Sequence, residues 1–176
     1  MFLSIIYNIG IMQPVFFFII AGVFLCLMRI IGKRWFWGYF LGGLTFGIYN
    51  EICFEFCWTY SAALSPMIWR DVPLIVVLGW GLETGLSLTI SNRIIDSLRL
   101  TNLWLKKLSD VILFFCFGYA SEIVMSKFGY WHYNFSMQAY PAIQISGYVF
   151  VGILVSCCGR TFQSLLDNKP NGKTCI

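Results

Sequence analysis

Two short segments of the chain place a glutamate in the same apolar setting. Phe46–Ile52 and Phe117–Ile123 share four identical positions at identical spacing, and their glutamates are Glu51 and Glu122. A charged carboxyl group deep in a membrane costs about 2.5 kcal/mol or more, so such a group is neutral, paired or turned toward a polar cavity. Acidic residues in this position are therefore candidates for function.

Two further acids belong with this pair. At a rise of about 1.5 Å per residue, Glu83 in the next apolar stretch falls at a similar membrane level, and Glu55 lies one helical turn from Glu51. No lysine or arginine lies inside these helices to form an ion pair, and the nearest candidate, Arg70, would lie above the membrane. Burial and neighbouring carboxyl groups both favour the protonated form, so at least one of these acids should be a buried proton donor. We predict catalytic roles for Glu51, Glu83 and Glu122, and a substrate-binding role for Glu55.

Glycines and aromatic residues recur around the glutamates. Gly47 and Gly118 each lie four residues before a glutamate and share its helix face, which leaves a notch for a ligand or for a packed helix. A Trp-x-Tyr sequence follows each glutamate, and its rings either anchor a helix end at the membrane surface or line a pocket. The predicted substrate-binding residues are these two glycines and the aromatic residues Trp58, Tyr60, Trp80, Trp131 and Tyr133.

The elements that would position these residues are membrane helices. The chain is 59% hydrophobic and 11% charged, against about 25% charged in a soluble domain. A helix needs about 20 mostly apolar residues to cross a bilayer. The sequence predicts an all-α integral membrane domain over residues 1–176, with about five transmembrane helices: Pro14–Ile31, Trp35–Tyr60, Val72–Ile90, Leu108–Tyr130 and Tyr140–Cys158.

The matching segments indicate an internal repeat. Residues 35–91 and 108–159 would form two hairpins in the same sense, each with a proline, Pro66 or Pro141, before its second helix. Residues 1–34 hold the N-terminal segment and first helix, and 160–176 form a tail. Basic residues concentrate in alternate loops, which predicts an outer N-terminus and a cytosolic C-terminus in a bacterial inner membrane, or in the endoplasmic reticulum of a eukaryote.

Several other kinds of function fit the sequence poorly. The net charge is +4, but the basic residues are scattered between apolar runs and form no patch, which argues against nucleic acid binding. Seven cysteines without a pairing pattern and the single histidine, His132, argue against a disulfide framework and a metal site, and no cofactor is expected. Acylation of Cys157 and Cys158, glycosylation of Asn134 and assembly into a homo-oligomer stay open.

A family resemblance adds to these observations. An aromatic-x-Tyr, a proline-containing turn and a Gly-Trp pair after an acidic helix resemble a signature of membrane-embedded carotenoid-modifying proteins, the carotenoid C-1,2 hydratases and the small-subunit lycopene cyclases. The residues are Trp58–Tyr60, Leu64–Pro66, Val72–Leu74 and Leu78–Trp80, with a looser version at Gly129, Trp131, Tyr133, Tyr140 and Pro141. The resemblance implies hydration or cyclisation of an isoprenoid that enters from the lipid and is protonated by Glu51 or Glu122.

Three hypotheses from different classes follow. The first is an enzyme that acts on a membrane-dissolved isoprenoid or other lipid. The second is a small proton- or cation-coupled transporter that uses the glutamates as its site. The third is a noncatalytic assembly subunit, in which the glycines pack against another helix. We favour the enzyme, because proton-initiated isoprenoid chemistry needs both a dry acid and electron-rich aromatic faces.

Overall fold

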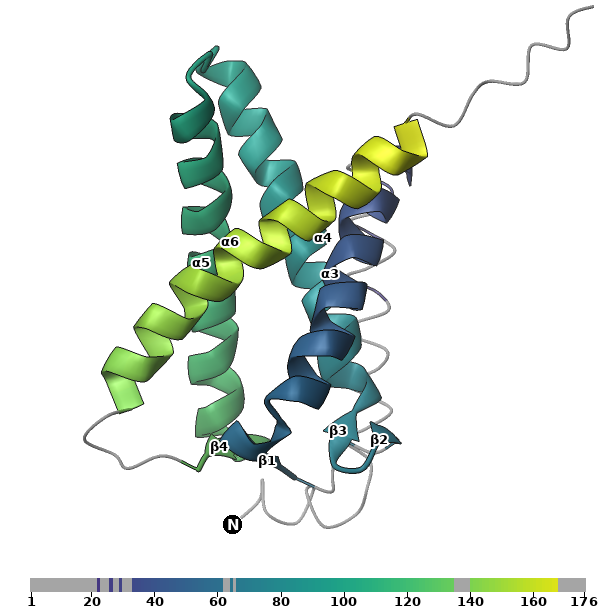
Figure 1. The fold of residues 1–176 in the computed structure, drawn as a ribbon, viewed down its shortest axis with the longest axis vertical. Helices are drawn as coiled ribbons and strands as arrows, with labels where there is room; N and C mark the ends of the chain where they lie inside the picture. The colour runs from purple at the N-terminus through teal and green to yellow at the C-terminus, as the bar shows by residue number, and fades with distance from the viewer. Residues whose placement is uncertain are drawn as a thin grey trace, which may run out of the picture.

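Four long helices dominate the described part of the structure. The computed structural model describes residues 33–61, 64, 66–134 and 140–167, together with positions 22, 26 and 29. The helices α3, α4 and α5 run along the long axis, and α6 crosses in front of them at an angle (Figure 1). The elements are α3 (Lys33–Cys53), the 3₁₀ helix η1 (Glu55–Cys57), β1 (Trp58–Tyr60), β2 (Met67–Trp69), β3 (Val72–Pro73), α4 (Leu74–Ser97), α5 (Leu103–Lys127), β4 (Trp131–Tyr133) and α6 (Tyr140–Asp167).

The helices pack around α3 and α4. The α3 helix lies against both α4 and α6, and α5 lies against the same two helices. The crossing of α3 and α6 requires a small residue, because a Cβ on Gly42 would lie 2.7 Å from the carbonyl oxygen of Cys158. One hydrophobic core cluster at the centre joins Phe46, Phe114 and Val155 from three helices.

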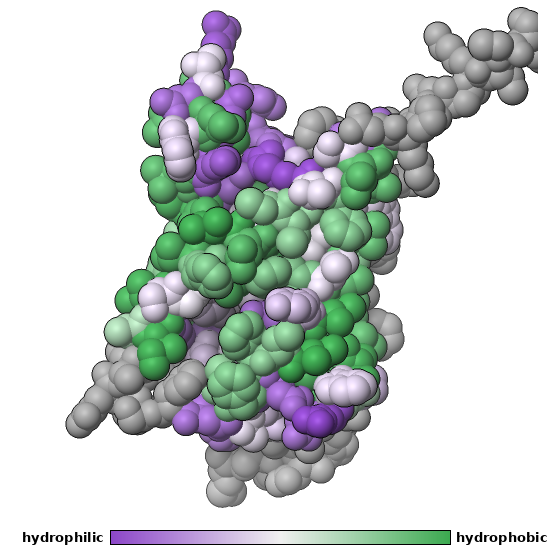
Figure 2. All heavy atoms as spheres, in the orientation of Figure 1, coloured by the Kyte–Doolittle hydropathy of each residue, from purple (hydrophilic) through white to green (hydrophobic). Residues whose placement is uncertain are grey.

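The described helices fit a membrane protein. Three of them are long and apolar enough to cross a bilayer, namely Leu74–Ser97, Leu103–Lys127 and Ala142–Asp167. The α3 helix is not among these three, and the predicted span Pro14–Ile31 falls outside the described residues. Figure 2 shows hydrophobic side chains across the middle of the face in view, with hydrophilic ones at the α4–α5 turn and at the opposite end.

Several predicted helix limits were wrong. The predicted helix Trp35–Tyr60 ends at Cys53, because the residues that follow turn through η1 and enter a strand. The predicted Leu108–Tyr130 begins at Leu103 and stops at Lys127, and Val72–Ile90 begins at Leu74 and extends to Ser97. The last helix continues to Asp167, past the predicted limit at Cys158, so part of the predicted tail is helical. The described part is thus mostly helical, with short strands that the sequence had not predicted.

A two-stranded antiparallel sheet joins the ends of α3 and α5. Strand β1 pairs with β4, so that Thr59 lies opposite His132 at the centre of the pairing. Two backbone hydrogen bonds extend the sheet on either side: Asn134 donates to the carbonyl of Cys57 at 2.9 Å, and Ser61 donates to that of Tyr130 at 2.7 Å. The sheet lies at the end of the molecule opposite the α4–α5 turn (Figure 1).

Candidate functional site

Glu51 is held by three hydrogen-bond donors near the end of α3. Its side chain is buried, and its Oε2 accepts hydrogen bonds from Trp58 Nε1 at 3.0 Å and from the Tyr60 hydroxyl at 2.6 Å. Its Oε1 accepts a third from Trp80 Nε1 at 2.7 Å. An indole N–H can only donate, so both oxygens of Glu51 act as acceptors. The carboxyl group is therefore fixed in one position.

Glu122 is held in the same way near the end of α5. It is buried, and its Oε1 accepts a hydrogen bond from Trp131 Nε1 at 2.6 Å. Its Oε2 accepts one from the Tyr148 hydroxyl at 2.9 Å, and Tyr133 is a further hydrogen-bond partner. Each glutamate thus has one tryptophan and one tyrosine of a nearby strand, and one aromatic donor from the helix that follows.

The two strands explain why Trp-x-Tyr is the recurring sequence. Side chains alternate between the two faces of a strand, so the outer two residues of each triplet point the same way. In both strands these outer residues are half-buried, while the middle ones, Thr59 and His132, are exposed. Burial, followed by the charge of Glu51, holds the pKa of Tyr60 well above its ordinary value. Tyr60 therefore keeps its proton and remains a donor.

A cavity of about 330 Å³ lies between the two glutamates, and both of them line it. Its aromatic wall includes six rings that carry an N–H or O–H group: Trp58, Tyr60, Trp80, Trp131, Tyr133 and Tyr148. None of the described residues that line the cavity is a lysine, arginine or histidine. The volume is at the lower end of the range of small-molecule sites, about 300–1,000 Å³.

Glu83 is the third acid of the cavity, and it lacks the donors that the other two have. It lies on α4 and lines the cavity. Its Oε1 is buried and has no hydrogen-bond partner among the described groups. This oxygen lies next to Gly118, where an added Cβ would collide with it. Glu83 is therefore the carboxyl group whose Oε1 lone pairs are free for a ligand.

The two predicted glycine notches are filled by aromatic rings from the next helix of each hairpin. A Cβ on Gly47 would lie 2.6 Å from the Cβ of Trp80, and one on Gly118 would lie 2.6 Å from Cε1 of Tyr148. Neither glycine lines the cavity. Their absent side chains instead let Trp80 and Tyr148 approach the glutamates. Helix packing, one of the two alternatives from the sequence, is thus what the glycines permit.

Most of the predicted site residues meet at the cavity, and three of them, the two glycines and Glu55, do not line it. Glu51, Glu83, Glu122 and all five predicted aromatic residues line it. Glu55 lies outside it and forms an ion pair with Arg70. Tyr148 lines the cavity but was not among the predicted site residues. It follows Pro141 by seven positions and comes after a glycine, as Trp80 follows Pro73 and Gly79, so the matching spacing was a usable signal.

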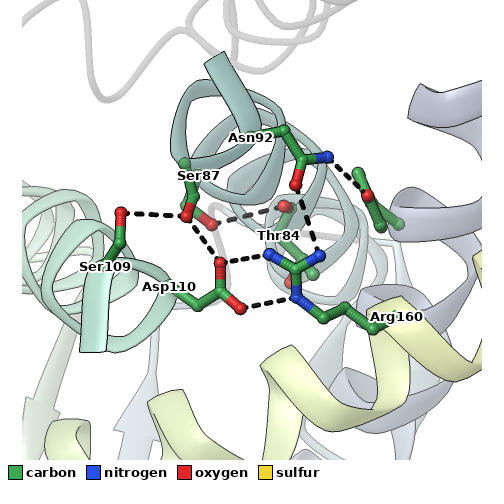
Figure 3. Close-up of polar contacts among 8 residues, drawn as sticks. Thr84, Ser87, Asn92, Ser109, Asp110 and Arg160 are labelled. Carbon is green, nitrogen blue, oxygen red and sulfur yellow. Dashed lines mark hydrogen bonds and ion pairs between the residues drawn. The ribbon is translucent and has the colours of Figure 1, made fainter. Parts of the chain in front are cut away.

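A second buried polar cluster lies nearer the α4–α5 turn. The Arg160 guanidinium on α6 binds both carboxylate oxygens of Asp110 on α5, at 2.6 Å each, and contacts Asn92 Oδ1 at 3.3 Å (Figure 3). Ser91 donates to the same carboxylate at 2.6 Å, and Asn92 donates to the Tyr39 hydroxyl at 2.6 Å. Asp110 is only 2% exposed. This network connects all four long helices.

The predicted tail, residues 160–176, placed Arg160 outside the last helix. That interpretation was wrong, because α6 continues past Arg160 and brings it onto Asp110. A bidentate arginine–carboxylate pair compensates part of the cost of burying both charges.

Comparison with known proteins adds no family. No protein-family model, no curated protein and no solved structure matches this chain. Within the described residues, no group of three or more histidine, cysteine, aspartate or glutamate side chains is placed to hold a metal ion. Function must therefore be inferred from the cavity and its acids.

Proposed function

We propose that the chain is a membrane enzyme that protonates a carbon–carbon double bond of a lipid-dissolved isoprenoid. The observation that carries this proposal is the juxtaposition of Glu83, whose Oε1 lacks a partner, with two fixed carboxyl groups in one aromatic cavity. The resemblance of the Trp58–Trp80 region to carotenoid-modifying proteins points to the same reaction class.

In the proposed reaction, Glu83 transfers its proton to one alkene carbon, and the other carbon becomes a carbocation. Hydration then adds water to this carbon, and the water loses a proton to a carboxylate. Cyclisation instead forms a bond from a second double bond of the same substrate to this carbon, which moves the positive charge to the other carbon of that double bond. A neighbouring carbon then loses a proton to the Glu83 carboxylate. In both cases the fixed carboxyl groups of Glu51 and Glu122 and the surrounding rings favour the positive charge.

The proposed site also supports the internal repeat. The antiparallel pairing places the central residues of the two Trp-x-Tyr triplets opposite each other, as a two-fold axis through the sheet would. Aligning the two halves so that Trp58 matches Trp131 also matches Cys57 with Tyr130 and Ser61 with Asn134. The hydrogen bond from Asn134 to Cys57 then corresponds to the one from Ser61 to Tyr130. We infer that residues 35–91 and 108–159 are duplicated hairpins.

The helices that follow the strands extend this correspondence. Pro73 immediately precedes α4, so it matches Pro141 better than Pro66 does. The spacing from these prolines aligns Trp80 with Tyr148, and both rings donate to a glutamate of their own half. In the same alignment, Val151 occupies the position in the second half that Glu83 occupies in the first. The acid with a free oxygen therefore belongs to one half alone.

Pigment and lipid profiling tests the proposed function. The chain would be expressed in a carotenoid-producing host, and pigments and neutral lipids would be separated by chromatography with mass detection. We expect a new hydrated or cyclised product with the native chain and none with Glu83→Gln. An unaltered pigment and lipid profile would reject the isoprenoid reaction.

Three carboxyl groups in one cavity also fit the second hypothesis, a proton- or cation-coupled transporter. Reconstituted vesicles distinguish the two functions. A transporter should carry a proton flux that depends on its substrate, and Glu51→Gln should remove that flux. An enzyme should convert its substrate in vesicles without any gradient.

A further inference from the structure

We propose that the cavity binds lipid-soluble organic cations, specifically quaternary ammonium groups that carry an alkyl chain. Binding of a stable cation requires no catalytic turnover, so this inference extends beyond the proposed reaction. It rests on the acids that line the cavity, on the aromatic rings between them and on the hydrogen bonds that both oxygens of two of the three acids already accept.

The charge balance of the cavity is one-sided. Glu51, Glu83 and Glu122 all line it, and no described lining residue is basic. Two described arginines outside the cavity are already paired: Arg160 binds Asp110, and Arg70 binds Glu55. Charges interact more strongly in a low-dielectric interior than in water. A positively charged group would therefore be attracted to the carboxylates of Glu51 and Glu122, and its charge would favour loss of the proton that Glu83 carries. An anion would be repelled.

The rings supply a second attraction. Trp58 packs against Tyr133 with 5.9 Å between ring centroids, and Tyr60 packs against Trp131 with 5.8 Å. The N–H and O–H groups of Trp58, Tyr60 and Trp131 are directed to the glutamates. What these rings offer a ligand is therefore their π surface, which attracts a cation within about 6 Å of the ring centroid.

The hydrogen-bond pattern favours a quaternary ammonium over a primary amine. A primary ammonium group has three N–H donors that need acceptors, but both oxygens of Glu51 and both of Glu122 already accept hydrogen bonds. Among the described residues that line the cavity, only Glu83 has a buried side-chain oxygen, Oε1, without a hydrogen-bond partner. A quaternary ammonium has no N–H groups to satisfy, so it gains from the charge and the rings without displacing any existing bond.

The cavity size limits the ligand. A volume of about 330 Å³ suits a compact head group with a short chain. We choose hexyltrimethylammonium as the probe, and 2,2-dimethyloctane as its neutral counterpart, because the two differ by replacement of the charged nitrogen with carbon. The pair has the same shape and separates the effect of charge from that of apolar contact.

Equilibrium dialysis with the radiolabelled cation provides the test. The whole chain would be held in nanodiscs of phosphatidylcholine, with empty nanodiscs as the baseline. We expect saturable binding that unlabelled hexyltrimethylammonium displaces and 2,2-dimethyloctane does not. Glu83→Gln and Glu122→Gln should each weaken binding, and Trp58→Leu should weaken it roughly two- to thirty-fold. The matched control, Asp71→Asn, removes an exposed acid outside the cavity and should bind as the native chain does.

Two results would overturn the inference. One is equal displacement by the neutral counterpart, which requires only the native chain and so does not depend on how the variants fold. The other is unchanged affinity in Glu83→Gln and Glu122→Gln. Cation binding without any change in the pigment profile would uphold this site and reject the isoprenoid reaction. Isoprenoid conversion without cation binding would do the opposite.

Discussion

Trp58 lies opposite Tyr133 in the β1–β4 sheet, and their rings meet edge to face at an interplanar angle of 86°. Trp58 donates to Glu51, and Tyr133 is a partner of Glu122. The sheet therefore links two carboxyl groups that lie on different helices. A change on one strand should affect the glutamate of the other half as well as its own.

Loss of one indole donor should destabilise the chain. Trp58→Phe keeps a ring but removes the hydrogen bond to Glu51, and a lost hydrogen bond to a charged group costs about 1.5–3 kcal/mol. Unfolding in detergent, followed by circular dichroism, measures the change. Trp104→Phe is the control, because Trp104 is 77% exposed. An equal effect of both substitutions would contradict the role of the indole N–H.

Glu122 and Glu83 should respond differently to amide replacement. Glu122→Gln places an NH₂ group among donors, and leaving a buried donor unsatisfied costs about 1–3 kcal/mol. Glu83→Gln disturbs no hydrogen bond at Oε1, so we expect stability close to that of the native chain together with loss of the reaction. Thermal unfolding and product formation should be measured on the same preparations. Comparable destabilisation by both substitutions would argue against these distinct environments.

The glycines beside the glutamates should not tolerate a methyl group. Gly47→Ala forces Trp80 to move, since the new Cβ would lie 2.6 Å from the Cβ of Trp80. Overpacking of this kind costs about 1–3 kcal/mol. Gly147→Ala is the matched helical control, because nothing lies within 4 Å of the added Cβ there. Thermal unfolding of both variants measures the difference. A larger loss of stability in Gly147→Ala than in Gly47→Ala would show that Trp80 does not fill the space beside Gly47 tightly.

The ion pair between Asp110 and Arg160 should behave as a unit. Removing one partner of a buried pair costs about 3–5 kcal/mol, and the 37% exposure of the Arg160 side chain should place the loss near the lower end. Asp110→Asn and Arg160→Gln should each destabilise the chain, and the double variant should recover part of the loss. A double-mutant cycle of unfolding free energies measures this coupling. Strict additivity would mean that the pair contributes no interaction of its own.

Part of this site was predictable from the sequence. The repeated spacing identified Glu51 and Glu122, and the level of Glu83 in the next helix brought it into the same group. The strand pairing was not predictable, because a Trp-x-Tyr triplet at the end of a helix resembles an interfacial anchor. Only the folded chain brings residues near position 58 to residues near position 133. The Asp110–Arg160 pair was missed for the same reason, since its partners lie on different helices.

The alignment of Val151 with Glu83 has a consequence for stereochemistry. Under the proposed duplication, a substrate would enter between two similar walls, each with a glutamate and its aromatic donors. On α4 the wall carries Glu83, whose Oε1 has no partner, and at the aligned position on α6 it carries the aliphatic residue Val151. A proton would then reach only one face of a double bond held in the cavity. The near-symmetric scaffold should therefore yield a single enantiomer rather than a racemic product.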